Sequence, residues 1–152
     1  MHIETLASLT GYQAFTKKED LLVYEKLIFT VKEDGQPTLW DHFGKVPKTG
    51  EAWSAKLPQD NPCTIMFDTQ TIEGTLSEVS ASCKVNDDGP TTTYRFAMTR
   101  QLDQGTVNSL IHPYFNAREE QEVEKPKTQW SKGGITTKIV PIQYAFTLDM
   151  DI

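Results

Sequence analysis

Apolar and polar residues alternate most regularly at the C-terminal end of the chain. An apolar residue occupies every second position from Ile142 to Ile152, and polar residues such as Gln143, Thr147 and Asp149 lie between them. Successive side chains of a β-strand point to opposite faces of its sheet. This period of two therefore predicts a half-buried strand.

A second alternation, over residues 63–99, predicts a three-stranded antiparallel meander. We place its turns at residues 72–74 and 87–90, where glycine, aspartate or proline favour tight turns. The first turn sets Cys63 opposite Cys83. In that register the apolar residues of the first hairpin share one face, apart from Met66, and a slip of one residue would scatter them over both faces.

The remaining segments complete an all-β prediction. Residues 21–32 predict a strand that turns back into residues 38–40, and residues 106–111 predict a short helix. Residues 116–134 are predicted to be a long polar loop. Together the segments predict one all-β domain over residues 1–152, of about seven to nine strands with one or two short helices. An antiparallel β-sandwich and a closed β-barrel both fit.

Composition and charge narrow the classes of protein. The chain of 152 residues is 38% hydrophobic and carries 15 basic against 21 acidic residues, for a net charge of −6. A chain of this length can bury a core, whereas nucleic acid needs a concentrated positive field. No window is long and apolar enough to span a membrane. We therefore expect no nucleic-acid partner, no membrane span, and either a cytoplasmic location or export without a Sec-type signal peptide.

Catalytic motifs are missing from the sequence. We find no nucleophile elbow, phosphate-binding loop, dinucleotide fingerprint or zinc-protease motif, and the chain has only three histidines. The sequence therefore favours a non-enzymatic protein with no catalytic residues, no cofactor and no metal site.

The two cysteines allow two interpretations. In the predicted register Cys63 and Cys83 are close enough for a disulfide, because directly opposed residues lie about 4.5–5.5 Å apart. In that register Cys83 also opposes Tyr94 in the third strand. The alternative, which we favour, is a pair of small buried thiols in a reducing compartment.

Four residues are candidates for binding a ligand or partner. His112 and Tyr114 lie in the densest mixture of polar and aromatic groups of the chain. Trp130 has no apolar companion at a regular spacing, so its ring is either a lid on a sheet edge or a surface offered to a sugar or protein. Trp40 is an intermediate case.

Three functional hypotheses remain. The first is a recognition or assembly protein that engages a protein or glycan through surface loops, with a homo-oligomer as one form. The second is a β-barrel that binds an apolar small molecule, as carrier or as cofactor-free cyclase or isomerase. The third is a small toxin or antagonist component that acts on a host protein. The sequence favours the first.

Overall fold

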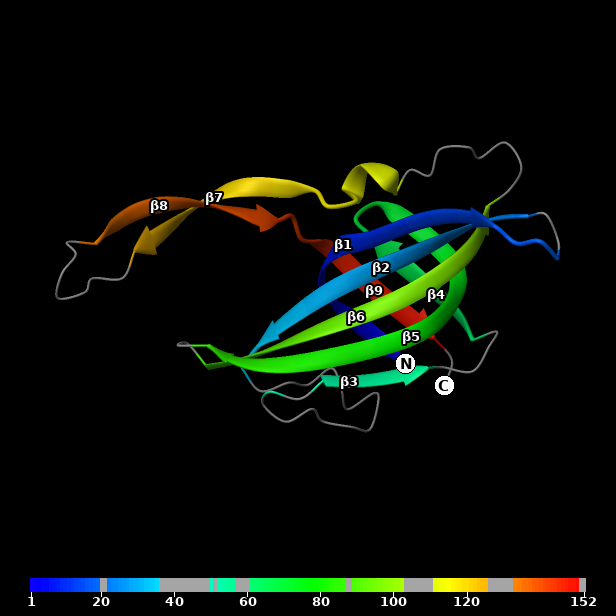
Figure 1. Cartoon of the computed structure of the whole chain (residues 1–152), viewed down its shortest axis with the longest axis horizontal. Coiled ribbons are helices and arrows are strands. Elements are labelled where there is room, and N and C mark those ends of the chain that lie inside the picture. The colour runs from blue at the N-terminus through cyan, green and yellow to red at the C-terminus, as the bar shows by residue number, and fades with distance from the viewer. Residues whose placement is uncertain are drawn as a thin grey trace.

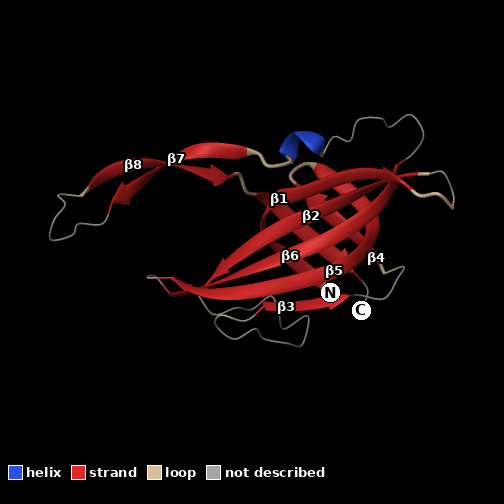
Figure 2. Cartoon of the chain, in the orientation of Figure 1, coloured by secondary structure: helices blue, strands red, loops and turns tan. Residues whose placement is uncertain are grey.

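The chain folds into a closed, antiparallel barrel with a two-stranded hairpin that projects from it (Figures 1 and 2). This is a computed structural model, and the structure describes residues 1–19, 22–35, 50, 52–56, 61–86, 89–102, 111–125 and 133–150. Within these ranges it has nine strands and one short helix. The predicted all-β class is therefore confirmed.

Six strands form the ring of the barrel. In order around it they are β1 (His2–Thr16), β2 (Val23–Asp34), β6 (Gly89–Leu102), β5 (Gln70–Asn86), β4 (Pro62–Phe67) and β9 (Tyr144–Met150). Pairing of β9 with β1 and of β5 with β6 closes the ring, and every pair is antiparallel. β4, β5 and β6 follow one another through hairpins, and β9 returns beside β4, which is a Greek-key connection.

Four further elements lie outside the ring. β3 (Ala52–Lys56) pairs with the edge of β5 that does not face β6. The 3₁₀-helix η2 (His112–Tyr114) precedes β7 (Arg118–Lys125), which pairs with β8 (Gly134–Pro141) to make the projecting hairpin. Along most of the ring each strand has a hydrogen-bonded neighbour on both sides, whereas in the described chain each strand of the hairpin has one unpaired edge.

Alternation along the strands places the apolar residues inside the barrel. On β2 the residues Leu27, Phe29 and Val31 are fully buried, and the residues between them are partly exposed. The strand predicted at the C-terminal end is confirmed as β9, where Phe146 and Leu148 face the core. The rings of Phe29 on β2 and Phe67 on β4 lie 5.0 Å apart, so side chains from opposite parts of the ring meet in the interior.

The predicted register of the first hairpin is wrong. β4 and β5 are joined at Asp68 and Thr69, so Cys63 lies opposite Gly74 and Phe67 opposite Gln70. The predicted turn at residues 72–74 lies inside β5. A bulge between Leu76 and Glu78 shifts the alternation of inward and outward side chains along β5 by one residue. Because of this shift, the apolar pattern also fitted a turn at residues 72–74.

The second hairpin has the predicted face but not the predicted pairs. Ala81 lies opposite Tyr94, and Cys83 lies opposite Thr92 rather than Tyr94. The pairing differs from the prediction by two residues, which returns each side chain to the same face. The buried set on β6, which includes Tyr94, Phe96 and Met98, is therefore as expected.

The structure differs from two other predictions. The predicted loop over residues 116–134 contains β7 from Arg118 to Lys125, because backbone pairing with β8 holds a strand that has no apolar face. The strand over residues 21–32 exists as β2, but in the described chain it pairs with β1 and β6. Its expected partner at residues 38–40 lies outside the described residues, and so does the expected helix at 106–111 except for Ile111, which lies in a turn.

Candidate functional site

The hairpin of β7 and β8 extends away from the barrel (Figure 1). We call residues 118–125 and 134–141 the arm. The pairing runs from Arg118 opposite Pro141 to Lys125 opposite Gly134. At about 3.4 Å per residue, a strand of this length spans roughly 27 Å. Each strand of the arm has one neighbouring strand in the described chain, so one edge of each is open to further pairing.

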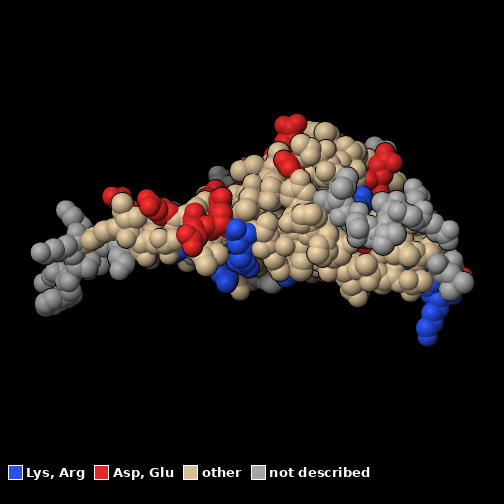
Figure 3. Space-filling view, turned by 90° about the horizontal axis from the view of Figure 1, so that it is seen from above, with Lys and Arg blue, Asp and Glu red and all other residues tan. Residues whose placement is uncertain are grey.

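One face of the arm combines carboxylates with exposed isoleucines. Glu120 lies opposite Ile139 and Glu124 opposite Ile135, with Glu122 between the two glutamates on the same side of β7. Ile135 and Ile139 are 70% and 67% exposed, the largest values among the big hydrophobic residues that the structure describes. We call these five residues the Glu–Ile face. Figure 3 shows acidic side chains gathered along the arm.

Hydrogen bonds fix the base of the arm to β1. The Asn116 nitrogen donates to the Leu9 carbonyl at 3.0 Å, and the Ser8 hydroxyl donates to the Ile142 carbonyl at 2.9 Å. The two chains of the arm meet where the Ile142 nitrogen donates to the Ala117 carbonyl at 2.9 Å. Asn116 has φ +52°, a left-handed conformation that asparagine tolerates better than most residues. The base of the arm is thus anchored on the barrel wall.

Tyr114, one of the predicted binding residues, belongs to this base. Its hydroxyl donates to Asp68 at 2.7 Å, and its ring lies edge-on to Tyr144 and Phe67 at 4.7 Å and 5.3 Å. The hydrogen bond to Asp68 is the main cause of the raised pKa of Tyr114, with burial second. Tyr114 therefore ties η2 to the turn between β4 and β5.

His112 is exposed and lies beside the same cluster. Its ring packs edge-on against Tyr12 of β1, with ring centres 5.0 Å apart, and its carbonyl accepts a hydrogen bond from the Phe115 nitrogen. The structure thus brings His112 and Tyr114 together near the base of the arm. Trp130 and Trp40, the other two predicted binding residues, lie outside the described residues.

The cysteines are free, buried thiols. Cys63 lies opposite Gly74, and Cys83 lies opposite Thr92, so the register that suggested a disulfide is not the register of the barrel. Burial raises the pKa of the Cys63 thiol to about 11. Because the thiolate is the reactive form, Cys63 has little nucleophilic character at neutral pH.

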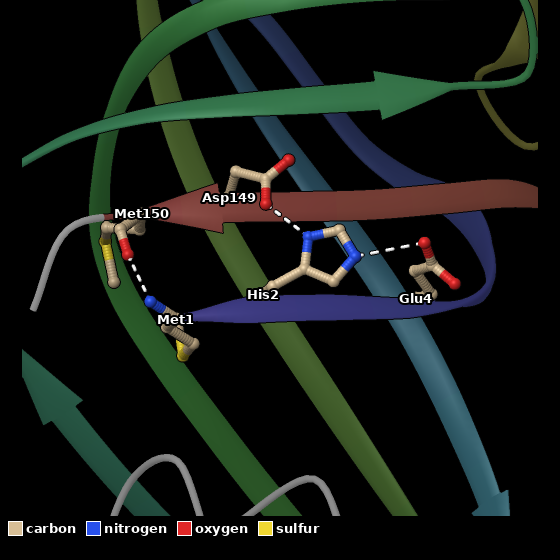
Figure 4. Close-up of polar contacts among 5 residues, drawn as sticks. All are labelled: Met1, His2, Glu4, Asp149 and Met150. Atoms are coloured by element: carbon tan, nitrogen blue, oxygen red, sulfur yellow. Dashed lines mark hydrogen bonds and ion pairs between the residues drawn. The ribbon is translucent and has the colours of Figure 1, made fainter.

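A polar cluster lies on the outer surface where β1 meets β9 (Figure 4). His2 contacts Asp149 through Nδ1 and Glu4 through Nε2, the second at 3.0 Å. The hydrogen bond to Asp149, followed by that to Glu4, raises the pKa of the exposed His2 ring. Beside it the Met1 nitrogen donates to the Met150 carbonyl at 2.6 Å. The cluster joins the first strand to the last.

A buried ion pair lies inside the barrel. Glu25 is fully buried, and its Oε1 accepts hydrogen bonds from Arg100 Nε and Nη2 at 3.3 Å and 3.0 Å. Arg100 comes from β6, beside β2, so the pair joins two neighbouring strands. In the described chain, no group of three or more histidine, cysteine, aspartate or glutamate side chains could hold a metal ion.

Sequence reasoning missed the Glu–Ile face. The available signals were the alternating glutamates at 120, 122 and 124 and the spacing of Ile135 and Ile139 by four, which keeps residues of one strand on one face. Neither signal marks a strand on its own, since both faces of the arm are largely polar.

In comparisons with known proteins, no family model, no curated protein and no solved structure matches this chain. None of the helices in the described residues has the length and apolar character needed to cross a membrane. Function must therefore be inferred from the arm and the barrel themselves.

Proposed function

We propose that this is a non-enzymatic recognition and assembly protein that contacts another macromolecule through the Glu–Ile face of the arm. The observation that carries the proposal is the exposure of Ile135 and Ile139 on a hairpin that projects from the barrel. Burying a branched aliphatic side chain is favourable by about 1.5–3 kcal/mol. A partner that covers both side chains therefore gains binding free energy. The charges of the flanking glutamates restrict which partners can bind.

The packing of the barrel interior supports recognition over the small-molecule alternative. Phe29, Phe67, Phe96 and Phe146 are each 1% exposed or less. Their rings are in mutual contact, with centres 5.0 Å apart for Phe29 and Phe67 and 5.8 Å apart for Phe96 and Phe146. The aromatic residues that would line a ligand cavity fill the interior with one another instead.

Site-specific photo-crosslinking tests the proposal. A photoreactive amino acid is placed at Ile139 in cells that produce the protein, and the covalent adducts are identified by mass spectrometry. We expect adducts to a protein or a glycan. The matched control carries the same amino acid at Met66, which is 50% exposed on β4 of the barrel, and we expect few adducts there. If position 139 gives only solvent-quenched product, or no more adducts than position 66, the proposal is wrong.

A further inference from the structure

The outer wall of the barrel has a hollow whose chemistry matches the arm. Lys26 and Ile28 of β2, Arg95 and Ala97 of β6, and Glu78 and Ser80 of β5 line a hollow of about 160 Å³. Two cations and two apolar side chains thus face outward against one carboxylate. The Glu–Ile face of the arm carries the opposite charge, with three carboxylates beside two isoleucines.

The spacing of the charges also matches. Glu120 and Glu124 are four residues apart on β7, which is about 14 Å along an extended strand. Lys26 is paired with Thr99, and Arg95 lies four residues along β6 from Thr99. The two cations are therefore offset by the same length in the strand direction, with Ile28 and Ala97 between them as a cross-strand pair.

Within one molecule these two surfaces are apart. In the described chain the strands of the arm pack extensively only with each other, and the arm points away from the barrel (Figure 1). The hollow is formed by the outward side chains of β2, β5 and β6. An arm that reaches such a hollow must therefore come from another molecule.

We infer that the occupant of the hollow is the arm of a second copy of this chain. This rests on the proposed function and names its partner. Glu120 and Glu124 pair with Lys26 and Arg95 of the neighbouring copy, and Ile135 and Ile139, which lie opposite these glutamates on the same face of the arm, are then buried against the outer wall of the barrel. Because arm and hollow are different surfaces, the contact is head-to-tail. Repetition of such a contact gives a closed ring or an open filament.

Charge exchange tests this inference through molar mass, measured by light scattering over a series of protein concentrations. The monomer mass is 17.2 kDa. We expect the wild-type mass to rise above this value with concentration. The arm variant E120K/E124K and the hollow variant K26E/R95E should each remain at the monomer mass, because like charges then face one another.

Two recovery experiments separate charge matching from general damage. The variant that carries all four changes should associate again, and so should an equimolar mixture of the arm variant with the hollow variant. All four positions are at the surface, so the free energy of unfolding should change little, which urea unfolding checks. The variant I135T/I139T provides a test without a change of charge and should also remain at the monomer mass.

Failure has a separate signature for each proposal. The second-copy inference is wrong if the wild type stays at 17.2 kDa over the whole series, or if neither recovery experiment restores association. If, in addition, the photoreactive group at Ile139 forms adducts with a different protein or with a glycan, the proposed function stands and its partner is that molecule. If that group forms no adducts, both proposals are wrong.

Discussion

The barrel and the arm are both antiparallel β-structure, yet they use their side chains in opposite ways. In the barrel, one face of every strand is buried, and residues such as Ile65 and Leu27 have no exposed surface. In the arm, Ile135 and Ile139 are mostly exposed, and the strand opposite them is rich in glutamate. Backbone pairing alone therefore does not determine what a strand contributes. The barrel strands hold the fold, and the arm strands remain available for contact.

The largest difference should come from the same substitution in the two regions. Arg100→Met leaves the Glu25 carboxylate buried without its cation, so we expect a loss of about 3–5 kcal/mol in the free energy of unfolding. Arg118→Met, at the exposed start of the arm, should change it by less than about 0.5 kcal/mol. Urea unfolding measures both.

The double variant E25M/R100M sharpens this test. Replacing both partners by apolar side chains removes the unpaired charge, so most of the lost stability should return. A single Arg100→Met variant as stable as the wild type would show that the pair is not a buried ion pair in solution.

A matched pair of isoleucines gives the next largest effect. Ile65→Ala removes a fully buried side chain from β4 and should cost about 2–5 kcal/mol, through lost burial and the cavity it leaves. Ile139→Ala in the arm should cost less than about 0.5 kcal/mol. Equal losses at the two positions would contradict the division between barrel and arm, because Ile139 would then be packed against the fold.

Gly74 tests how closely the barrel strands approach one another. A Cβ there would lie 2.5 Å from the Thr99 carbonyl oxygen, a backbone atom that cannot rotate away. We expect Gly74→Ala to cost about 1–3 kcal/mol. Gly11→Ala is the comparison: its Cβ would lie 2.8 Å from Ile28 Cβ, which cannot rotate away either, but the contact is longer than at Gly74 and is with a side chain, so we expect a smaller loss there. A smaller loss at Gly74 than at Gly11 would be the contrary result.

The smallest effect is expected at the His2 cluster, on the outer surface where β1 meets β9. Because its contacts raise the pKa of His2, the charged ring favours the folded state below the usual value of about 6.5, and this contribution is lost as the pH rises through the folded-state value. An NMR titration should give a midpoint above 6.5 for His2. Asp149→Asn should lower that midpoint more than Glu4→Gln, and an unchanged midpoint in Asp149→Asn would contradict the account.

The sequence predicted the barrel better than the arm, for a physical reason. Where one face of a strand is buried, the alternation is visible, so the buried faces of β6 and β9 were predicted correctly. The face pattern does not distinguish pairings that differ by two residues, so Ala81 was assigned the wrong partner. The bulge after Leu76 has no local signal at all, and it moved the predicted turn away from Asp68.

The arm could not be predicted in this way because it buries almost nothing. Its strands are defined by backbone hydrogen bonds between residues that are distant from any apolar stripe. Of the predicted binding residues, His112 and Tyr114 were placed near the site, but they support the base of the arm rather than its exposed face.

Stability of a variant without the arm tests the central claim most directly. Residues 120–139 are replaced by a short glycine-serine linker, which keeps the bond between Ala117 and Ile142 at the base. Unfolding in urea is measured at a protein concentration where the chain is monomeric, since association would add apparent stability. We expect a folded barrel whose free energy of unfolding lies within about 0.5 kcal/mol of the wild type. A variant that fails to fold, or loses about 2 kcal/mol or more, would show that the arm is part of what holds the barrel together.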